Sequence, residues 1–356
     1  MSNKPLIEDN KKWDVYLDSK HIRKLDLKDL KIITLLMNNA RLSLSNIQKI
    51  TRLSKPAILN RIERLKKDGI FIGEPTTFID FLPLGVEGYN IEIQTGMTIL
   101  EKEEYILYLK KNGFITNIST ITGRKFDILI RVLDTGNYID RIIEYLSKGI
   151  KDLRVYQVKS MHVQKQTNLF QLDLNTTLKK PDSSYSNLFS HKKKSLQKID
   201  KKDIDILLYL AQNPCESIVE LSEKLELAKD TVKSKIKKLI EAKVIRMFFQ
   251  GYNPYKLGFT TYLLKLKIFE RTRDKEVIEF LNSLQIGTGV MKQVEEWNII
   301  AVLFFNNRTQ LANFEKDLMH RFEDIIIDYE IHIYDEQPHY DLFPQEVYKE
   351  LRKRFD

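Results

Sequence analysis

The chain has 356 residues, of which 42% are hydrophobic, and its 58 Lys and Arg exceed its 49 Asp and Glu, giving a net charge of +9. That length suffices for several small domains with their own cores. The single cysteine, Cys215, excludes an internal disulfide and a four-thiolate zinc site, and fits a reducing cytosol. The positive surplus favours polyanionic partners, which leaves nucleic acid and anionic membrane as candidates.

The first 24 residues and the longest apolar run both argue against export or membrane insertion. Residues 1–24 carry charges throughout and lack the apolar centre of a secretory signal. The run Ile299–Phe305 is far shorter than the ~20 residues that a membrane span needs, and it is typical of a buried strand. We therefore expect a cytoplasmic protein without a membrane partner.

The chain repeats itself at an offset of 174 residues, so that Asp26 aligns with Asp200 and Asp29 with Asp203. The segment 25–43 lies over 199–217 without a gap, and the apolar spacing continues to match beyond it. Such self-similarity indicates two copies of one structural unit.

Each copy is predicted to begin with three short helices and two strands, the order of a winged helix-turn-helix domain, which we call a reader. Apolar residues recur at helical spacing in the first segment. Ser43 and Ser217 stand where an N-cap would start the second helix, and Ser54 precedes the third. Gly69 is expected to end that third helix.

The longer segment that follows in each copy is predicted to run strand, helix, strand, strand, helix, strand. The stretches IEIQ and YLLKLKIF alternate as strands, and DILIRVL and NIIAVLFF are typical of central strands. Helices are expected at 101–111 and 138–147, and at 274–284 and 308–322. This is the ferredoxin-like arrangement, whose antiparallel sheet carries both helices on one face and leaves the other face in need of a partner.

The predicted fold class is α+β, with two winged helix-turn-helix domains alternating with two ferredoxin-like βαββαβ domains. The linker between the copies is rich in Ser, Asn, Thr and Lys, and its lysines are either solvated or contact phosphates without sequence preference. The expected order is an N-terminal extension (1–24), winged helix-turn-helix 1 (25–80), sensor domain 1 (81–172), the linker (173–198), winged helix-turn-helix 2 (199–254), and ferredoxin-like domain 2 with a C-terminal extension (255–356).

The third helix of each copy has the pattern of a recognition helix, with an apolar stripe on one side and polar residues on the other. The early part of such a helix meets base edges and its flanks meet phosphates. Asn60 is predicted to pair with adenine, and Thr231 and Ser234 to make single base contacts. The alternative is an ordinary solvated face. Phosphate contacts are expected from Lys55, Arg61, Arg64, Lys229, Lys235 and Lys238.

The segment LDLKDLKIITLLMNNARLSLSNIQKITRLSKPAILNRIERLKKDGIFIG resembles the DNA-binding half of the Lrp/AsnC family of regulators. The segment after it is similar to that family's ligand-sensing and oligomerisation domain. The resemblance implies a regulator that binds double-stranded DNA and pairs its uncovered sheet faces, as a pseudo-dimer within one chain or as a homo-oligomer. The residues that carry it are Asp26, Asp29, Asn39, Ala40, Arg41, Ser54, Arg61, Leu65 and Gly69.

The same resemblance implies a small-molecule effector, often an amino acid, near the turn between the second and third sheet strands. In the first copy Thr122, Gly123, Arg124 and Asp127 resemble the family's Gly-x-x-Asp effector turn. The corresponding turn of the second copy, 295–298, has neither the Gly nor the Asp. The alternative for the first copy is a plain hairpin in which Gly123 only supplies the turn.

The second reader departs from the family pattern. Pro214 and Cys215 replace Ala40 and Arg41, and Ala228 replaces the capping Ser54. Loss of a Ser cap costs about 1 kcal/mol of helix stability, which a core can absorb. With unlike recognition helices, we expect a DNA site whose two halves differ.

Two other functions fit the same architecture. Siroheme decarboxylases are also AsnC-like tandems, and KLGFTTYLL and EWNIIAVLFF are similar to them, but that family's His-containing strand is replaced by residues 290–293. An architectural protein would bind DNA without reading bases. No catalytic residue and no cofactor are predicted, and neither is a metal site, although Asp328, Glu330 and His332 share one strand face, where they are either potential ligands or the solvated side of a sheet.

Overall fold

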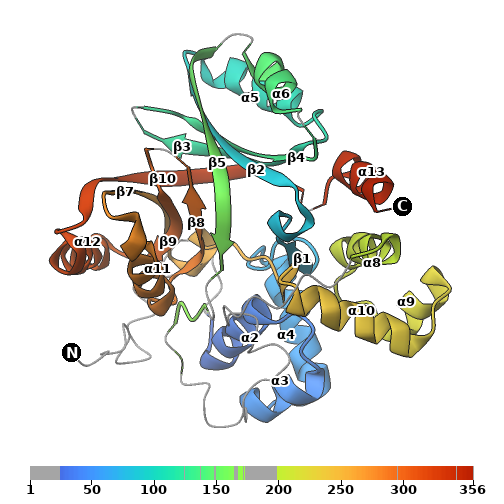
Figure 1. Cartoon of the computed structure of the whole chain (residues 1–356). Coiled ribbons are helices and arrows are strands. Elements are labelled where there is room, and N and C mark those ends of the chain that lie inside the picture. Colours follow the sequence, from blue (N-terminus) through green and yellow to red (C-terminus); the bar gives the residue numbers. More distant parts are fainter. Residues whose placement is uncertain are drawn as a thin grey trace.

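The computed structural model describes residues 25–355 except 124, 137, 148–149, 164–166, 171, 173–198, 295 and 342. The predicted extension (1–24) and linker (173–198) lie outside the described residues. The helical readers lie together in the lower part of Figure 1, and the sheets with their helices lie above them. None of the helices in the described part of the chain is long and apolar enough to cross a bilayer.

Each winged helix-turn-helix domain contains three helices and one strand. The predicted caps are confirmed, because Ser43, Ser54 and Ser217 each accept a hydrogen bond from the backbone N–H three residues on, whereas Ala228 offers no side-chain cap. The elements of the first copy are α2 (Leu27–Asn38), α3 (Leu44–Thr51), α4 (Lys55–Lys67) and β1 (Thr76–Ile79), and those of the second are α8 (Lys201–Gln212), α9 (Ile218–Leu225), α10 (Lys229–Glu241) and β6 (Ile245–Phe249).

The prediction of two strands per reader was wrong, because in the described residues each reader supplies one strand to a shared sheet. β1 pairs antiparallel with β6, with Thr76 opposite Phe249 and Phe78 opposite Met247. A strand cannot satisfy its backbone groups alone, so each copy completes the wing of the other. The sequence pattern shows that a strand exists but not which chain segment pairs with it.

The segment after each reader forms the predicted ferredoxin-like unit. The first sheet has the order β3-β4-β2-β5 and the second β8-β9-β7-β10, all antiparallel. The first unit comprises β2 (Glu87–Thr95), α5 (Ile99–Leu109), β3 (Ile115–Thr122), β4 (Ile128–Asp134), α6 (Ile139–Leu146) and β5 (Ile150–His162), and the second β7 (Thr260–Ile268), α11 (Asp274–Ser283), β8 (Gly287–Gln293), β9 (Ile299–Phe305), α12 (Arg308–Phe322) and β10 (Ile326–Tyr340).

The two sheets close on each other into one eight-stranded barrel. β5 pairs with β8, and β3 pairs with the long β10. One face of each sheet packs under its own helices, and the other faces the barrel interior. Figure 1 shows α5 and α6 on one side and α11 and α12 on the other. The sheet faces that are not covered by helices therefore pack against each other within one chain, which makes the two halves a pseudo-dimer.

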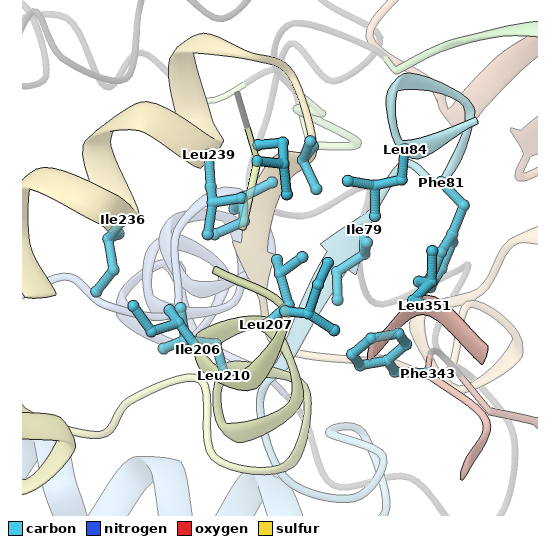
Figure 2. Packing of buried hydrophobic residues seen from close by; sticks show 14 of the residues in the cluster. Ile79, Phe81, Leu84, Ile206, Leu207, Leu210, Ile236, Leu239, Phe343 and Leu351 are labelled. Atoms are coloured by element: carbon cyan, nitrogen blue, oxygen red, sulfur yellow. The ribbon is translucent and has the colours of Figure 1, made fainter. Parts of the chain in front are cut away.

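Segments of one copy also complete the cores of the other. Ile79 at the end of β1, and Phe81 and Leu84 just after it, pack with Leu207 and Leu210 of α8 in the second reader (Figure 2). Conversely, Leu257 and Phe259 lie in the core of the first reader. The remaining elements are the short 3-10 turns η2 (Leu82–Leu84), η4 (Tyr255–Leu257) and η5 (Arg271–Arg273), and the C-terminal α13 (Gln345–Arg354).

Candidate nucleic-acid interface

The third helix of each reader turns its apolar stripe inward and its polar residues to solvent. Ile58 and Leu65 are fully buried in α4, as are Val232 and Leu239 in α10. The side chains predicted to meet bases or to contact phosphates from the first turn are exposed, namely Lys55 and Asn60 on α4 and Lys229, Thr231 and Ser234 on α10.

Two arginines of α4 predicted to contact phosphates form ion pairs within the protein instead. Arg61 Nη1 lies 2.8 Å from Asp26 Oδ1 and 2.7 Å from Asp29 Oδ1. Arg64 also binds the carboxylate of Asp29, whose side chain is buried. Partial burial opposes ionisation of Asp26, but the Asp29 N–H and Arg61 hold its pKa below the usual range. These contacts fasten the start of α2 to the middle of α4.

The second reader has the same arrangement with lysines. Lys235 Nζ lies 2.6 Å from Asp200 Oδ2 and 3.1 Å from Asp203 Oδ1, and Lys238 binds Asp203 as well. Asp203 is fully buried. Four of the six predicted phosphate contacts are thus already paired with aspartates in this structure. The aspartates belong to the repeated motif, but helical periodicity does not reveal that they reach the third helix.

A basic corner, which we define as Lys28, Lys31, Lys49 and Arg52, lines a recess between α2 and the end of α3 in the first reader. The recess has a volume of about 390 Å³ and is also lined by Leu27, Ile50 and Thr51. Arg52 lies in the turn before α4 and has left-handed backbone, with φ of 55°. The sequence reasoning missed this corner because it considered only the third helices.

The corresponding corner of the second reader is acidic. At the offset of 174 residues its positions are Lys202, Asp205, Glu223 and Glu226. Glu226 also has left-handed backbone, with φ of 53°, which supports the equivalence with Arg52. Three of the four equivalent corner positions therefore carry opposite charges in the two copies.

The predicted effector residues lie at the edge of the barrel, and those that the structure describes have contacts within the protein. Thr122 Oγ1 donates to Asp335 of β10 at 2.7 Å, and a methyl group on Gly123 would lie 2.8 Å from His332 Nδ1. Asp127 accepts hydrogen bonds from the N–H and hydroxyl of Thr95. Arg124 lies outside the described residues.

Asp127 is further paired with Lys102 of α5 at 2.7 Å. Partial burial works against ionisation of this carboxyl, but Lys102 and Thr95 hold its pKa below the usual range. In this structure the carboxylate joins the end of β2 to α5, so an effector that used it would compete with these contacts.

The row of Asp328, Glu330 and His332 does not gather as a metal site. Glu330 and His332 lie inside the barrel, with His332 Nε2 at 3.0 Å from Glu330 Oε2, whereas Asp328 is exposed. No group of three metal-binding side chains occurs among the residues that the structure describes. The two inward residues belong to an ionic network instead.

A family model described as winged helix-turn-helix DNA-binding matches residues 25–71 and 199–246. A proline dehydrogenase transcriptional activator from Rhizobium radiobacter is 30% identical over 115 residues, covering 32% of this chain and 69% of the relative. A transcriptional regulator of the helix-turn-helix type from Methanocaldococcus jannaschii is 23% identical over 116 residues, or 33% of this chain and 78% of the relative. The chain belongs to the Lrp/AsnC family. It is a tandem member of these DNA-binding transcription regulators.

Among solved structures, the siroheme decarboxylase NirDL is similar in fold over the whole tandem of this Lrp/AsnC protein. It aligns with a TM-score of 0.53 and 13% identity, covering 92% of this chain and 97% of that one. At that identity the likeness concerns the fold alone.

Proposed function

We propose that this tandem regulator is sequence-specific and recognises a DNA site with two unlike halves, one bound by α4 and the other by α10. The observation that carries the proposal is the shared β1–β6 sheet, which joins two readers whose exposed residues differ at equivalent positions. Asn60 in the first reader corresponds to Ser234 in the second. Paired helix-turn-helix readers bind paired half-sites, so unlike helices favour unlike half-sites.

Each exposed residue has a role that fits its chemistry. Asn60 can bond bidentately to adenine, while Thr231 and Ser234 can each make one contact to a base edge. Lys55 and Lys229, in the first turn of their helices, are placed for phosphates.

The four paired cations have a conditional role in this proposal. Arg61 and Arg64 hold aspartates in this structure, so a phosphate would compete with those carboxylates for them, and the same holds for Lys235 and Lys238. We propose that they stabilise the helices in free protein and contact phosphates at the edge of the bound site.

Selection of random duplex DNA on the purified chain tests the proposal. We expect an enriched motif, bound at least ~1,000-fold more tightly than random DNA. Asn60→Ala should degrade one half of that motif, and its matched variant Ser234→Ala should degrade the other. Binding without enrichment would favour an architectural protein, and a strict palindrome would contradict the unlike halves.

A siroheme decarboxylase is the second candidate, because the NirDL fold matches 92% of this chain. Between the sheets, however, Trp297, Lys265 and Phe126 are fully buried and occupy the interior. We expect the purified protein to give no saturable shift in visible absorbance when mixed with siroheme. A saturable shift would show siroheme binding and favour the decarboxylase over a regulator without a cofactor.

We further propose that an amino-acid effector binds at the turn of the first copy, near Thr122 and Asp127. The support is the resemblance of this turn to the family's effector turn. Thermal shift measurements with a panel of amino acids test it, with Thr122→Val as the variant. A ligand that stabilises the wild type but not the variant is expected, and an equal shift in both would place the site elsewhere.

A further inference from the structure

A buried ion pair lies at the centre of the barrel. Lys265 Nζ of β7 is 2.6 Å from Glu92 Oε1 of β2, and the side chains are only 1% and 2% exposed. Three aromatic rings surround the ammonium, with centroids 4.8 Å away for Trp297, 5.0 Å for Phe126 and 5.6 Å for Tyr156. Burial raises the pKa of Glu92 against the opposing pull of Lys265.

Glu92 and Lys265 occupy the same position in the two copies. Each is the sixth residue of its strand, and the strands β2 and β7 have matching lengths and nearly identical burial patterns. Each strand also lies between the third and fourth strands of its own unit, with Leu129 and Arg154 beside Glu92. Equivalent residues that touch lie on the pseudo-twofold axis relating the two halves.

Glu92 and Lys265 have opposite charges at equivalent positions, and the charges of their neighbours on β5 and β10 are opposite as well. Arg154 is opposite Glu92 in the first sheet, and the equivalent neighbour of Lys265 in the second is Glu330, at 3.6 Å. Glu330 is also bound by Lys125 and His332. The first half thus has an acidic residue, Glu92, at the axis and a basic neighbour, whereas the second half has a basic residue, Lys265, at the axis and an acidic neighbour.

This reversal determines which halves can pair. In a symmetric dimer of first halves, Glu92 would face a second Glu92, and in a dimer of second halves Lys265 would face a second Lys265. Like charges buried together are strongly unfavourable, whereas opposite charges in contact are tolerated. We propose that the Glu92–Lys265 pair acts as a partner-selection device, which permits a first half to pair only with a second half.

A buried ion pair often adds little net stability but specifies pairing, in the manner of a single polar residue in a coiled coil. The device restricts assembly to one reader of each kind per barrel. It stands apart from the proposed DNA site, since it concerns only the contact between sheets.

A charge-exchange cycle in the full chain tests the proposal. Glu92→Lys and Lys265→Glu each bury like charges, so we expect the Tm to fall by roughly 6–20 °C. The double variant restores an opposite pair and should recover more than half of that loss, although each new residue keeps its old neighbour, Arg154 or Glu330. Additive losses in the double variant would overturn the proposal.

Partner choice is measured separately by refolding the E92K and K265E chains together. The first half of the E92K chain presents a base at the axis, which matches the acid in the second half of the K265E chain. The unaltered first half of K265E likewise matches the unaltered second half of E92K. The mixture should therefore form an exchanged heterodimer, which native mass spectrometry detects.

The doubly neutral variant E92Q/K265Q, refolded as a mixture of isotopically light and heavy chains, provides the control. It buries no charge in either arrangement and should show no such preference. No more heterodimer from the charged mixture than from the neutral one would overturn the proposal, even if neither single variant folds alone.

Discussion

The two readers share a fold but differ in their surface charge and in the segments that pack against them. The first has a basic corner, and its α2 is contacted by the segment after β5, where Asn38 and Thr167 exchange hydrogen bonds of 2.7 and 2.8 Å. The second has an acidic corner and is contacted by α13. The apolar positions of the third helix kept their chemistry, as in Ile58 and Val232 or Leu65 and Leu239, while the exposed corner positions diverged.

The equivalent residues Asp205 and Lys31 show how the charge of a corner is connected to the contacts of its reader. Asp205 of α8 binds Arg352 Nε and Tyr348 Oη of α13, both at 2.9 Å. Its counterpart in the first reader is Lys31, which lines the open recess. The acid in the second copy serves an internal contact, whereas the base in the first copy remains at the surface, where it can attract phosphate.

The largest effect is expected from weakening the two contacts that hold the readers, namely α13 against the second reader and the segment after β5 against the first. Leu351→Ala removes a fully buried side chain between α13 and α8, and should cost about 2–5 kcal/mol of unfolding free energy. The matched variant in the first copy is Leu169→Ala, at a residue packed against the core that includes α2. Urea unfolding measures the loss in each.

Hydrogen exchange then shows whether each of these two contacts stabilises only its own reader. Leu351→Ala should speed amide exchange in α8 and leave α2 unchanged, and Leu169→Ala should do the reverse. Equal acceleration of both helices by either variant would mean that the readers open as one unit.

A smaller effect is expected at the buried aspartates. Asp29→Asn weakens the contacts to Arg61 and Arg64 and should cost about 1.5–3 kcal/mol, because hydrogen bonds to charged groups are lost. The matched variant, Asp203→Asn, does the same for Lys235 and Lys238.

The two variants should also bind DNA more tightly, with a steeper salt dependence, because freed cations become available to phosphates. Fluorescence anisotropy at several salt concentrations measures this. Weaker binding at temperatures where the variants remain folded would indicate that the ion pairs orient the recognition helix and that the cations do not contact DNA.

Much of this architecture could be predicted from the sequence, because it depends on local signals. The capping serines start their helices as expected, and the alternating strands and helical periods give both ferredoxin-like units. These features depend on residues a few positions apart.

The family resemblance implied that the sheet faces pair, but which residues and strands of the two copies touch was beyond such local reasoning. Pairing of β1 with β6, closure of the barrel and the Glu92–Lys265 contact join residues from opposite copies, far apart along the chain. Even the Asp29–Arg61 pair joins the first helix of a reader to the third, so Arg61 looked like a free phosphate contact. Without the tertiary arrangement, a charged residue on a helix cannot be assigned to solvent, to DNA or to a buried partner.

Exchanging charge between the corners should change DNA binding with little effect on stability. Lys49→Glu with Arg52→Glu gives the first reader the residues of the second, and Glu223→Lys with Glu226→Arg does the reverse. If both basic residues contact phosphates, the first pair lowers the slope of log affinity against log salt by about 2. The second pair should raise affinity. Unfolding free energies should stay within about 0.5 kcal/mol for each exposed substitution.

The smallest effect concerns pH and the shared capping carboxylates, Asp26 and Asp200. In both copies burial opposes ionisation, but hydrogen bonds and the paired cation hold the pKa below the unfolded value of ~3.9. Their contribution to stability is therefore present above that value and is lost as the pH falls through the lower, folded pKa. Both side chains are about half exposed, which keeps the contribution below about 1 kcal/mol each.

Asp26→Asn and Asp200→Asn should thus be slightly less stable than the wild type at pH 7, and the gap should close as the pH falls from about 4 to 2. Urea unfolding across this range measures it. Because Arg61 and Lys235 serve the two caps alike, the gap should be similar in both copies. A difference in unfolding free energy that persists unchanged at pH 2 would show that the carboxylate charge is not what stabilises the cap. A difference in one copy alone would show that the two readers have diverged even at this pair of a capping carboxylate and a cation.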